Sequence, residues 1–189
     1  TTGWVIVSAE ITTKAEIDYD SIIRQTLDEI GYTKDDLGAI EMQEGGEKKL
    51  WVSTLIKNQS PHIAQGVDSD ENHEQGAGDQ GLMFGYACNE TDVLMPAPIH
   101  YSHKILRLMA EDRKSGKLKN IEPDSKSQIT VEYKDGKPVS VKSVVISTQH
   151  SPDVHQSQVR ELVKPYKEKS IPKDLINGID DNEIYVNPT

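Results

Sequence analysis

One glycine-rich segment carries the residue types and spacing most typical of a ligand-binding loop. Residues 76–86 read GAGDQGLMFGY and contain four glycines, one carboxylate and one amide. Glycine lets the backbone take positive φ values and approach a ligand closely. The spacing differs from GxGxxG and from a Walker loop, and no strand pattern precedes it, which disfavours a standard nucleotide-binding loop. We therefore expect a polar loop carrying Asp79, followed by a buried apolar stretch.

Four further polar residues could bind a ligand, although their types alone are weak signals. Glu10 ends an apolar strand pattern, and Gln59 lies at the start of a long polar stretch. Asp124 and Lys126 form a D-x-K pair, in which lysine is a compact cation suited to polyphosphate. Without further context, solvated surface groups explain these four residues more readily than catalysis does. A turn role explains Asp79 about as well as a chemical one.

The elements that must position these residues can be read from the apolar spacing. Residues 4–12 and 50–56 are rich in β-branched and apolar residues and predict strands, the first covered on one or both faces. Between them, helical spacing over residues 21–30 predicts a helix that Asp20 caps and Gly31 ends. The three elements predict a helix layer on a sheet.

The rest of the chain predicts a long loop and then a second set of elements. Residues 57–81 show little apolar periodicity, which is typical of a functional or disordered stretch. Two helices and two strands follow, the helices over residues 99–114 and 153–163 and the strands over residues 127–133 and 137–147. Asp135-Gly136 predicts a tight hairpin turn, and Pro165 is expected to end or kink the last helix. The pattern indicates the α+β class.

Composition restricts the function further. The 189 residues are enough for one large domain or two small ones, and a net charge of −10 disfavours a nucleic-acid or anionic-membrane surface. A single cysteine excludes a disulfide framework and favours a reducing cytosol. No apolar run is long enough to span a membrane, and no signal peptide pattern is present. His100 and His103 share a helical face, but two ligands without a third make a poor metal site.

The string GAGDQG closely resembles the signature of the S-adenosylmethionine synthetases, also called methionine adenosyltransferases. Further segments resemble the same family: AEITT at 9–13, QSPHIAQGVD at 59–68, NETDVLMPAPI at 89–99, PDSKSQ at 123–128 and STQH at 147–150. The resemblance covers nearly the whole chain and is weakest over residues 37–50, where the family usually has a shorter connection. Ala9 stands where the family usually has glycine, and His62 where aspartate is common.

The resemblance implies an architecture of two similar α+β domains. Each would be a small mixed or antiparallel sheet with helices packed on one face, the first over residues 1–68 and the second over residues 69–189. It also implies an internal fragment, since an upstream HPDK motif and a C-terminal third rich in Gly and Lys are missing from the sequence. We therefore expect this chain alone to be catalytically inactive.

The resemblance also implies a reaction and residue roles. The family moves the adenosyl group of ATP to the sulfur of L-methionine and splits the released triphosphate to phosphate and pyrophosphate. Positive charge grows on sulfur and negative charge on the leaving group, so carboxylates and cations must be preorganised. Resemblance assigns Asp79 and Lys126 as catalytic residues and Glu10 and Gln59 to methionine. It assigns three residues to ATP: Asp124, Ser125 and Lys126.

Further expectations from the family concern a mobile loop, cofactors and partners. The loop that closes over the site would consist of Gln59, Ser60, Pro61, His62, Ile63, Ala64, Gln65, Gly66, Val67, Asp68 and Ser69, with Gly66 as a hinge. Mg²⁺ and K⁺ would be bound mostly outside this chain, with no metal ligand within it. A cytoplasmic homodimer or dimer of dimers would form the active site between subunits, without nucleic acid or membrane.

The sequence also allows two other functions. One is a non-catalytic oligomerisation or regulatory partner of a complete synthetase. The other is an ATP-binding module of a different transferase, which the absence of a known phosphate loop disfavours.

Overall fold

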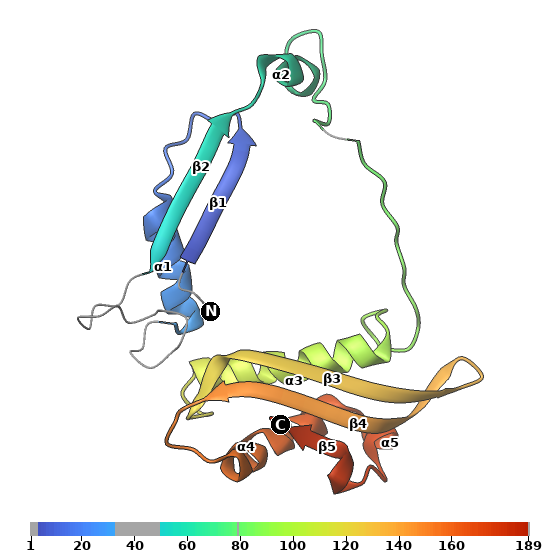
Figure 1. Cartoon of the computed structure of the whole chain (residues 1–189). Coiled ribbons are helices and arrows are strands. Elements are labelled where there is room, and N and C mark those ends of the chain that lie inside the picture. Colours follow the sequence, from blue (N-terminus) through green and yellow to red (C-terminus); the bar gives the residue numbers. More distant parts are fainter. Residues whose placement is uncertain (1–3, 33–49, 79, 189) are drawn as a thin grey trace. The chain divides into compact units, whose positions relative to one another are not determined.

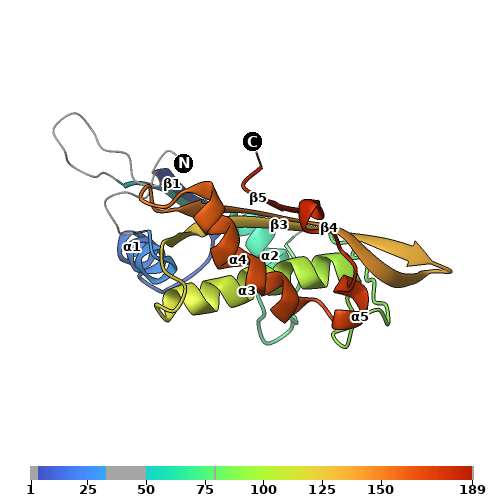
Figure 2. The same cartoon turned by 90° about the horizontal axis from the view of Figure 1, so that it is seen from below.

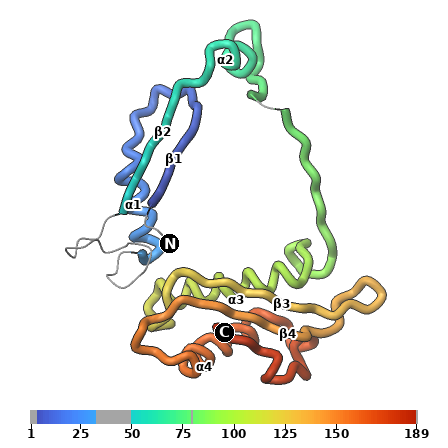
Figure 3. Tube along the Cα trace, viewed as in Figure 1, coloured from blue at the N-terminus to red at the C-terminus, as the bar shows by residue number. Residues whose placement is uncertain are grey.

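The computed structural model describes residues 4–32, 50–78 and 80–188. They fall into two compact units, Thr1–Gly85 and Tyr86–Thr189, which the colours from blue to red follow along the chain (Figure 3). Asp79 and most of the insertion expected at 37–50 lie outside the described residues. The family's domain boundary, expected after Asp68, stays a prediction.

The first unit is a two-stranded parallel sheet with helices before and after its second strand. Its elements are β1 (Trp4–Ile11), α1 (Tyr19–Ile30), β2 (Trp51–Asn58) and α2 (Pro61–Val67). The register pairs Trp4 with Trp51 and Ile11 with Asn58. Parallel strands need a long crossover, and α1 lies in that connection, beside the strands (Figure 1).

Sequence predicted the presence and the end of helix α1 correctly but not its capping residue. The cap is Asp18, whose Oδ1 accepts a hydrogen bond from the Ser21 backbone N–H at 3.1 Å, so the expectation that Asp20 caps the helix was wrong. Asp20 lies inside the first turn and pairs with Arg24 at 2.6 Å. At the other end, Gly31 takes the left-handed conformation with φ of 106°, as its position predicted.

One face of the β1–β2 sheet carries exposed apolar side chains. Alternation along the strands and the parallel register put four large apolar side chains on that face, each between 55 and 63% exposed: Trp4, Ile6, Trp51 and Leu55. The indole N–H of Trp4 donates to the Ser53 hydroxyl at 3.0 Å. The prediction was that one or both faces of the first strand are covered. In the structure, the face with Trp4 and Ile6 is exposed.

The stretch after the glycine-rich loop also differs from its prediction. Leu82, Met83 and Phe84 are 82–92% exposed, and Tyr86 is exposed as well. No helix or strand is assigned to residues 80–87. The expected burial fails because no described strand pairs with this segment to cover its side chains.

The second unit is a mixed three-stranded sheet with helices on one side. Its elements are α3 (Ala97–Lys114), β3 (Ile121–Lys134), β4 (Lys137–His150), α4 (Gln156–Ser170), α5 (Lys173–Ile176), the 3₁₀ turn η1 (Asp181–Glu183) and β5 (Ile184–Val186). The strand order is β3-β4-β5, with β3–β4 antiparallel and β4–β5 parallel. Figure 2 shows α3, α4 and α5 on the same side of the strands. The α+β class expected from sequence is confirmed.

Alternation along the long hairpin separates a core face from an open face. The turn is formed by Asp135 and Gly136, both with positive φ (50° and 72°), as the Asp-Gly pair predicted. The buried strand residues on the core side include Ile129, Val144 and Ile146. They belong to one core cluster with buried helix residues, which include Ile105, Val159 and Val163. This burial supplies most of the unit's hydrophobic stabilisation.

Strand β3 and helix α4 exceed their predicted lengths by more than the other elements do. Strand β3 starts at Ile121, well before the predicted start at residue 127. The start was missed because a register shift between Ile121 and Ser125 interrupts the alternation of buried and exposed side chains there. Helix α4 runs from Gln156 through Pro165 to Ser170, so the expected range of 153–163 starts and ends too early, and the expected end of the helix at Pro165 was wrong. The helix continues because residues on both sides of the proline, Val163 and Tyr166, are buried in the core.

Candidate functional site

The carboxyl edge of the parallel sheet gathers the two residues expected to contact methionine. Glu10 is the register partner of Lys57 near the ends of the strands. Gln59 follows β2 directly, where its backbone N–H donates to the Ile11 carbonyl at 3.4 Å and its Oε1 accepts from the Thr12 hydroxyl at 3.3 Å. Because parallel strands end at the same edge, both side chains belong to one region. Ligands in open α/β sheets bind at such edges.

The start of the glycine-rich segment packs against α2 and Gln59. The Gly76 N–H donates to the Val67 carbonyl at 3.1 Å. A Cβ atom added to Gly76 would lie 2.2 Å from the Gly66 carbonyl oxygen, so glycine is required there. A Cβ atom added to Gly78 would lie 3.6 Å from the Gln59 amide nitrogen. The glycines therefore bring residues 76–78 to the same edge of the sheet.

The expected mobile loop contains regular structure. Helix α2 occupies its centre, with Pro61 at the first helical position, where a missing N–H is harmless. The interpretation of residues 57–81 as irregular was therefore wrong for this part. Gly66 lies within the helix, and its role as a hinge stays a prediction.

The residues expected to contact ATP lie at one end of the β3–β4 hairpin. Asp124 and Lys126 are two positions apart on β3 and share its exposed side, whereas Ser125 points to the opposite side. A cavity of about 250 Å³ opens beside them. Six residues line it: Asp124, Lys126, Ser147, Thr148, Gln149 and Asn187.

Four of these six lining residues were not assigned a role from sequence: Ser147, Thr148, Gln149 and Asn187. In the observed register Ser147 lies opposite Lys126 and Thr148 opposite Ser125. Asn187 comes from the end of β5 and contacts Thr148. A hairpin without irregularities would pair Lys126 with Val145, because the turn pairs Lys134 with Lys137 and each step back adds one. The bulges that shift this register have no clear sequence signal.

Metal-binding side chains do not cluster in the part of the chain that the structure describes. Within residues 4–32, 50–78 and 80–188, no three His, Cys, Asp or Glu side chains are arranged to hold a metal ion. The pair His100 and His103 on α3 therefore gains no third ligand there. None of the described helices is both long and apolar enough to cross a membrane.

The two small sheets, each with polar residues gathered at a strand end, define an α+β protein with a candidate ligand-binding region in each unit. Residues 74–189 match the sequence profile described as S-adenosylmethionine synthetase, central domain. The chain belongs to the S-adenosylmethionine synthetase family, as its resemblance predicted.

A curated relative extends the match over the whole chain. The S-adenosylmethionine synthase of Pelagibacter ubique (strain HTCC1062) is 56% identical over 191 residues, which cover 100% of this chain and 47% of the relative. The chain thus spans about half the length of that relative.

Proposed function

We propose that the whole protein transfers the adenosyl group of ATP to the sulfur of L-methionine and yields S-adenosylmethionine. The observation that carries the proposal is the pair Asp124 and Lys126, which share the open side of β3 beside a cavity. Family membership and the 56% identical relative support it. The released triphosphate would be cleaved to phosphate and pyrophosphate.

The proposed roles follow from the charges that develop during transfer. The methionine sulfur attacks the 5′ carbon of ATP, and the bond to the triphosphate oxygen breaks with its electron pair leaving on that oxygen. Lys126 would stabilise the growing negative charge, and Asp79 would stabilise the positive charge on sulfur. Glu10 would pair with the amino group of methionine, and Gln59 would orient the substrate. Asp124 would hold the nucleotide through its side chain and Ser125 through its backbone, since the Ser125 hydroxyl lies against that of Thr148.

Metal ions and subunit contacts belong to the same proposal. Mg²⁺ would neutralise the triphosphate and K⁺ would activate the enzyme. Their ligands would lie mostly outside this chain, since the described residues hold no cluster of three or more His, Cys, Asp or Glu side chains that could bind a metal ion. The open apolar face around Trp4 and Trp51 supports a homodimer or dimer of dimers, because large apolar faces mark interaction sites. We assign the protein to the cytoplasm, since its single cysteine suits a reducing compartment.

The proposal is tested on the full-length protein by measuring S-adenosylmethionine formed from ATP and methionine. Lys126→Met removes the cation, and we expect kcat/KM for ATP to fall roughly 10²–10³-fold, as for other preorganised electrostatic groups. Lys134→Met, at the tip of the same hairpin, is the matched control and should leave the rate unchanged.

Two results would contradict the proposal. Equal activity of the Lys126→Met and Lys134→Met proteins would remove Lys126 from the site. A wild-type protein that forms no product, but binds a complete synthetase and alters its activity, would favour the non-catalytic partner role instead.

A further inference from the structure

Asn187 makes a set of contacts that its place after a short strand does not require. Its backbone N–H continues the β4–β5 ladder by donating to the Ile146 carbonyl at 3.0 Å. Its side-chain amide then makes the two hydrogen bonds to β4 that the peptide groups of a longer β5 would make. Oδ1 accepts from the Thr148 N–H at 2.7 Å, and Nδ2 donates to the Thr148 carbonyl at 3.0 Å. The backbone itself turns away with φ of 43°.

Thr148 links the Asn187 contacts to β3, the strand opposite. Its side chain is only 6% exposed, and its hydroxyl lies 2.6 Å from that of Ser125, its register partner. Ser125 lies between Asp124 and Lys126 in the chain. A continuous series of hydrogen bonds therefore runs from the Asn187 amide to the backbone that carries the acidic and basic side chains of the cavity.

This end of the hairpin needs such a constraint. A register shift interrupts the β3–β4 pairing between Ile121 and Ser125, so the ladder alone does not hold residues 122–124, which include Asp124. Bulges release local pairing and re-aim side chains. The Asn187 contacts hold β4 at Thr148, which forms with Ser125 the first regular pair after the shift.

Helix α4 holds the strand from which Asn187 projects. The Gln156 side chain donates to the Val186 carbonyl at 2.6 Å, and the Arg160 guanidinium donates to the Ile184 carbonyl. These donors satisfy the edge of β5 that does not face β4. A strand of three residues is thereby fixed on both sides.

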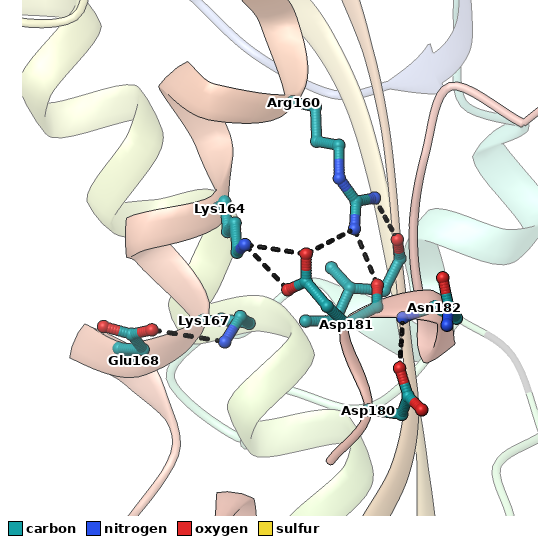
Figure 4. A network of polar contacts seen from close by, with 8 residues as sticks. Arg160, Lys164, Lys167, Glu168, Asp180, Asp181 and Asn182 are labelled. Atoms are coloured by element: carbon teal, nitrogen blue, oxygen red, sulfur yellow. Dashed lines mark hydrogen bonds and ion pairs between the residues drawn. The ribbon is translucent and has the colours of Figure 1, made fainter. Parts of the chain in front are cut away.

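The turn before β5 is tied to the same helix. Arg160 donates to the Asp181 carbonyl at 2.6 Å, and Lys164 pairs with the Asp181 carboxylate at 2.7 Å (Figure 4). Hydrogen bonds and charge from Lys164 and Arg160 lower the pKa of Asp181, so it stays ionised at neutral pH. The Asn187 side chain is thus presented from a rigid support.

We propose that Asn187 is a positioning residue for the nucleotide site. Its amide fixes Thr148 and, through Ser125, the relative placement of Asp124 and Lys126 beside the cavity. This inference rests on the proposed function, since it takes ATP as the ligand of that cavity. Sequence matching assigned Asn187 no role.

The test is Asn187→Gly in the full-length protein. Glycine keeps the left-handed backbone without strain and removes only the amide. Loss of two hydrogen bonds of ordinary strength is expected to raise KM for ATP about tenfold. KM for methionine should hold, because the methionine region lies in the first unit, and any fall in kcat should accompany the rise in KM for ATP, because Lys126 also acts in the transfer step. Binding of a non-hydrolysable ATP analogue with Mg²⁺ should weaken by the same factor.

Asn120→Gly is the matched control. Asn120 also has positive φ, 65°, and precedes the same hairpin, but it does not line this cavity. Its substitution should leave both KM values unchanged. Asn187→Asp supplies a second contrast, because it keeps the size of the side chain and sets an oxygen against the Thr148 carbonyl. We expect an effect at least as large as that of glycine.

Each outcome decides the inference. A rise in KM for ATP with an unchanged KM for methionine supports it, whereas an unchanged KM for ATP, or a loss of kcat with both KM values constant, assigns Asn187 a purely structural role and overturns it. If Asn187→Gly fails to fold, Ser125→Ala tests the same series of bonds from its other end, with the same criteria. A wild-type protein that binds no ATP overturns the proposed function and this inference together.

Discussion

At the residue scale, the position of Gly76 leaves no room for a side chain. A Cβ atom there would meet the Gly66 backbone carbonyl at 2.2 Å, and a backbone atom cannot rotate out of the way as a flexible side chain can. Gly85, a few residues later, has nothing within 4 Å of an added Cβ atom. The two glycines therefore differ in what they tolerate, although sequence presents them alike.

This difference predicts opposite results for two alanine substitutions. Gly76→Ala should lower the free energy of unfolding of the first unit by about 1–3 kcal/mol, the usual effect of overpacking. Gly85→Ala should change it by less than about 0.5 kcal/mol. Urea denaturation monitored by tryptophan fluorescence measures both, since Trp4 and Trp51 lie in this unit. Equal stability of the two variants would show that residues 76–78 do not pack against α2.

A second residue-scale feature links the start of α3 to the hairpin. The Glu90 carboxylate accepts from the Tyr133 hydroxyl at 2.5 Å and from the Ala97 N–H, at the first turn of α3, at 2.9 Å. The Tyr133 hydrogen bond, followed by that from Ala97, lowers the pKa of Glu90. Partial burial, followed by Glu90, raises the pKa of Tyr133 to about 12.

These shifts predict the pH dependence of the second unit. The lowered Glu90 pKa contributes stability that is present above the ordinary value of 4.5 and is lost as pH falls below it. The raised Tyr133 pKa contributes stability that is present below pH 10 and is lost as pH rises towards 12. Thermal unfolding of Glu90→Gln and Tyr133→Phe between pH 3 and pH 11 should show weaker dependence at the acid and alkaline ends, respectively. Curves parallel to the wild type would contradict this account.

At the element scale, helix α3 depends on one of its faces. Ile105 is fully buried among the core residues, whereas Ile99, on the same helix, is 44% exposed. Ile105→Ala should lower the free energy of unfolding by about 2–5 kcal/mol, because it leaves a cavity as well as removing apolar contacts. Ile99→Ala is the matched control and should cost clearly less. Guanidinium denaturation followed by circular dichroism gives both values, and similar losses would contradict the assigned packing of α3.

Elements with local signals were the ones that sequence predicted well. Asp135-Gly136 and Gly31 need positive φ, a demand that few residue types meet, so the hairpin and the end of α1 were correctly located. Helix α4 was predicted too short because buried neighbours outweigh the cost of Pro165. Helix α2 was missed because seven residues give too little periodicity to detect.

At the scale of the whole molecule, the segment that spans the boundary of the two units is the most accessible apolar stretch described. Leu82, Met83, Phe84 and Tyr86 are exposed and have no assigned helix or strand. Tyr101 and Tyr166, by contrast, are buried in the second unit. Proteases cleave exposed, irregular backbone first.

Limited chymotrypsin digestion of the 189-residue chain should therefore cut first within residues 82–86. The expected product is a resistant fragment that starts near residue 87 and retains α3 and the β3-β4-β5 sheet, because its core lies within the second unit. Mass spectrometry identifies the ends, and circular dichroism checks that the fragment remains folded. Early cleavage at Tyr101 or Tyr166 would contradict the division into two units.

The sequence by itself determined the family, the α+β class and the segments that carry the candidate ligand residues. Those conclusions rest on strings of neighbouring residues, such as GAGDQG and the D-x-K pair, which keep their meaning whatever the remote parts of the chain do. The tertiary structure alone decided that Asn187 lies against Thr148, 39 positions away, and that Ser147 faces Lys126. Both depend on a strand register that bulges shift and that packing against α4 holds, and no local pattern encodes a register set by distant contacts.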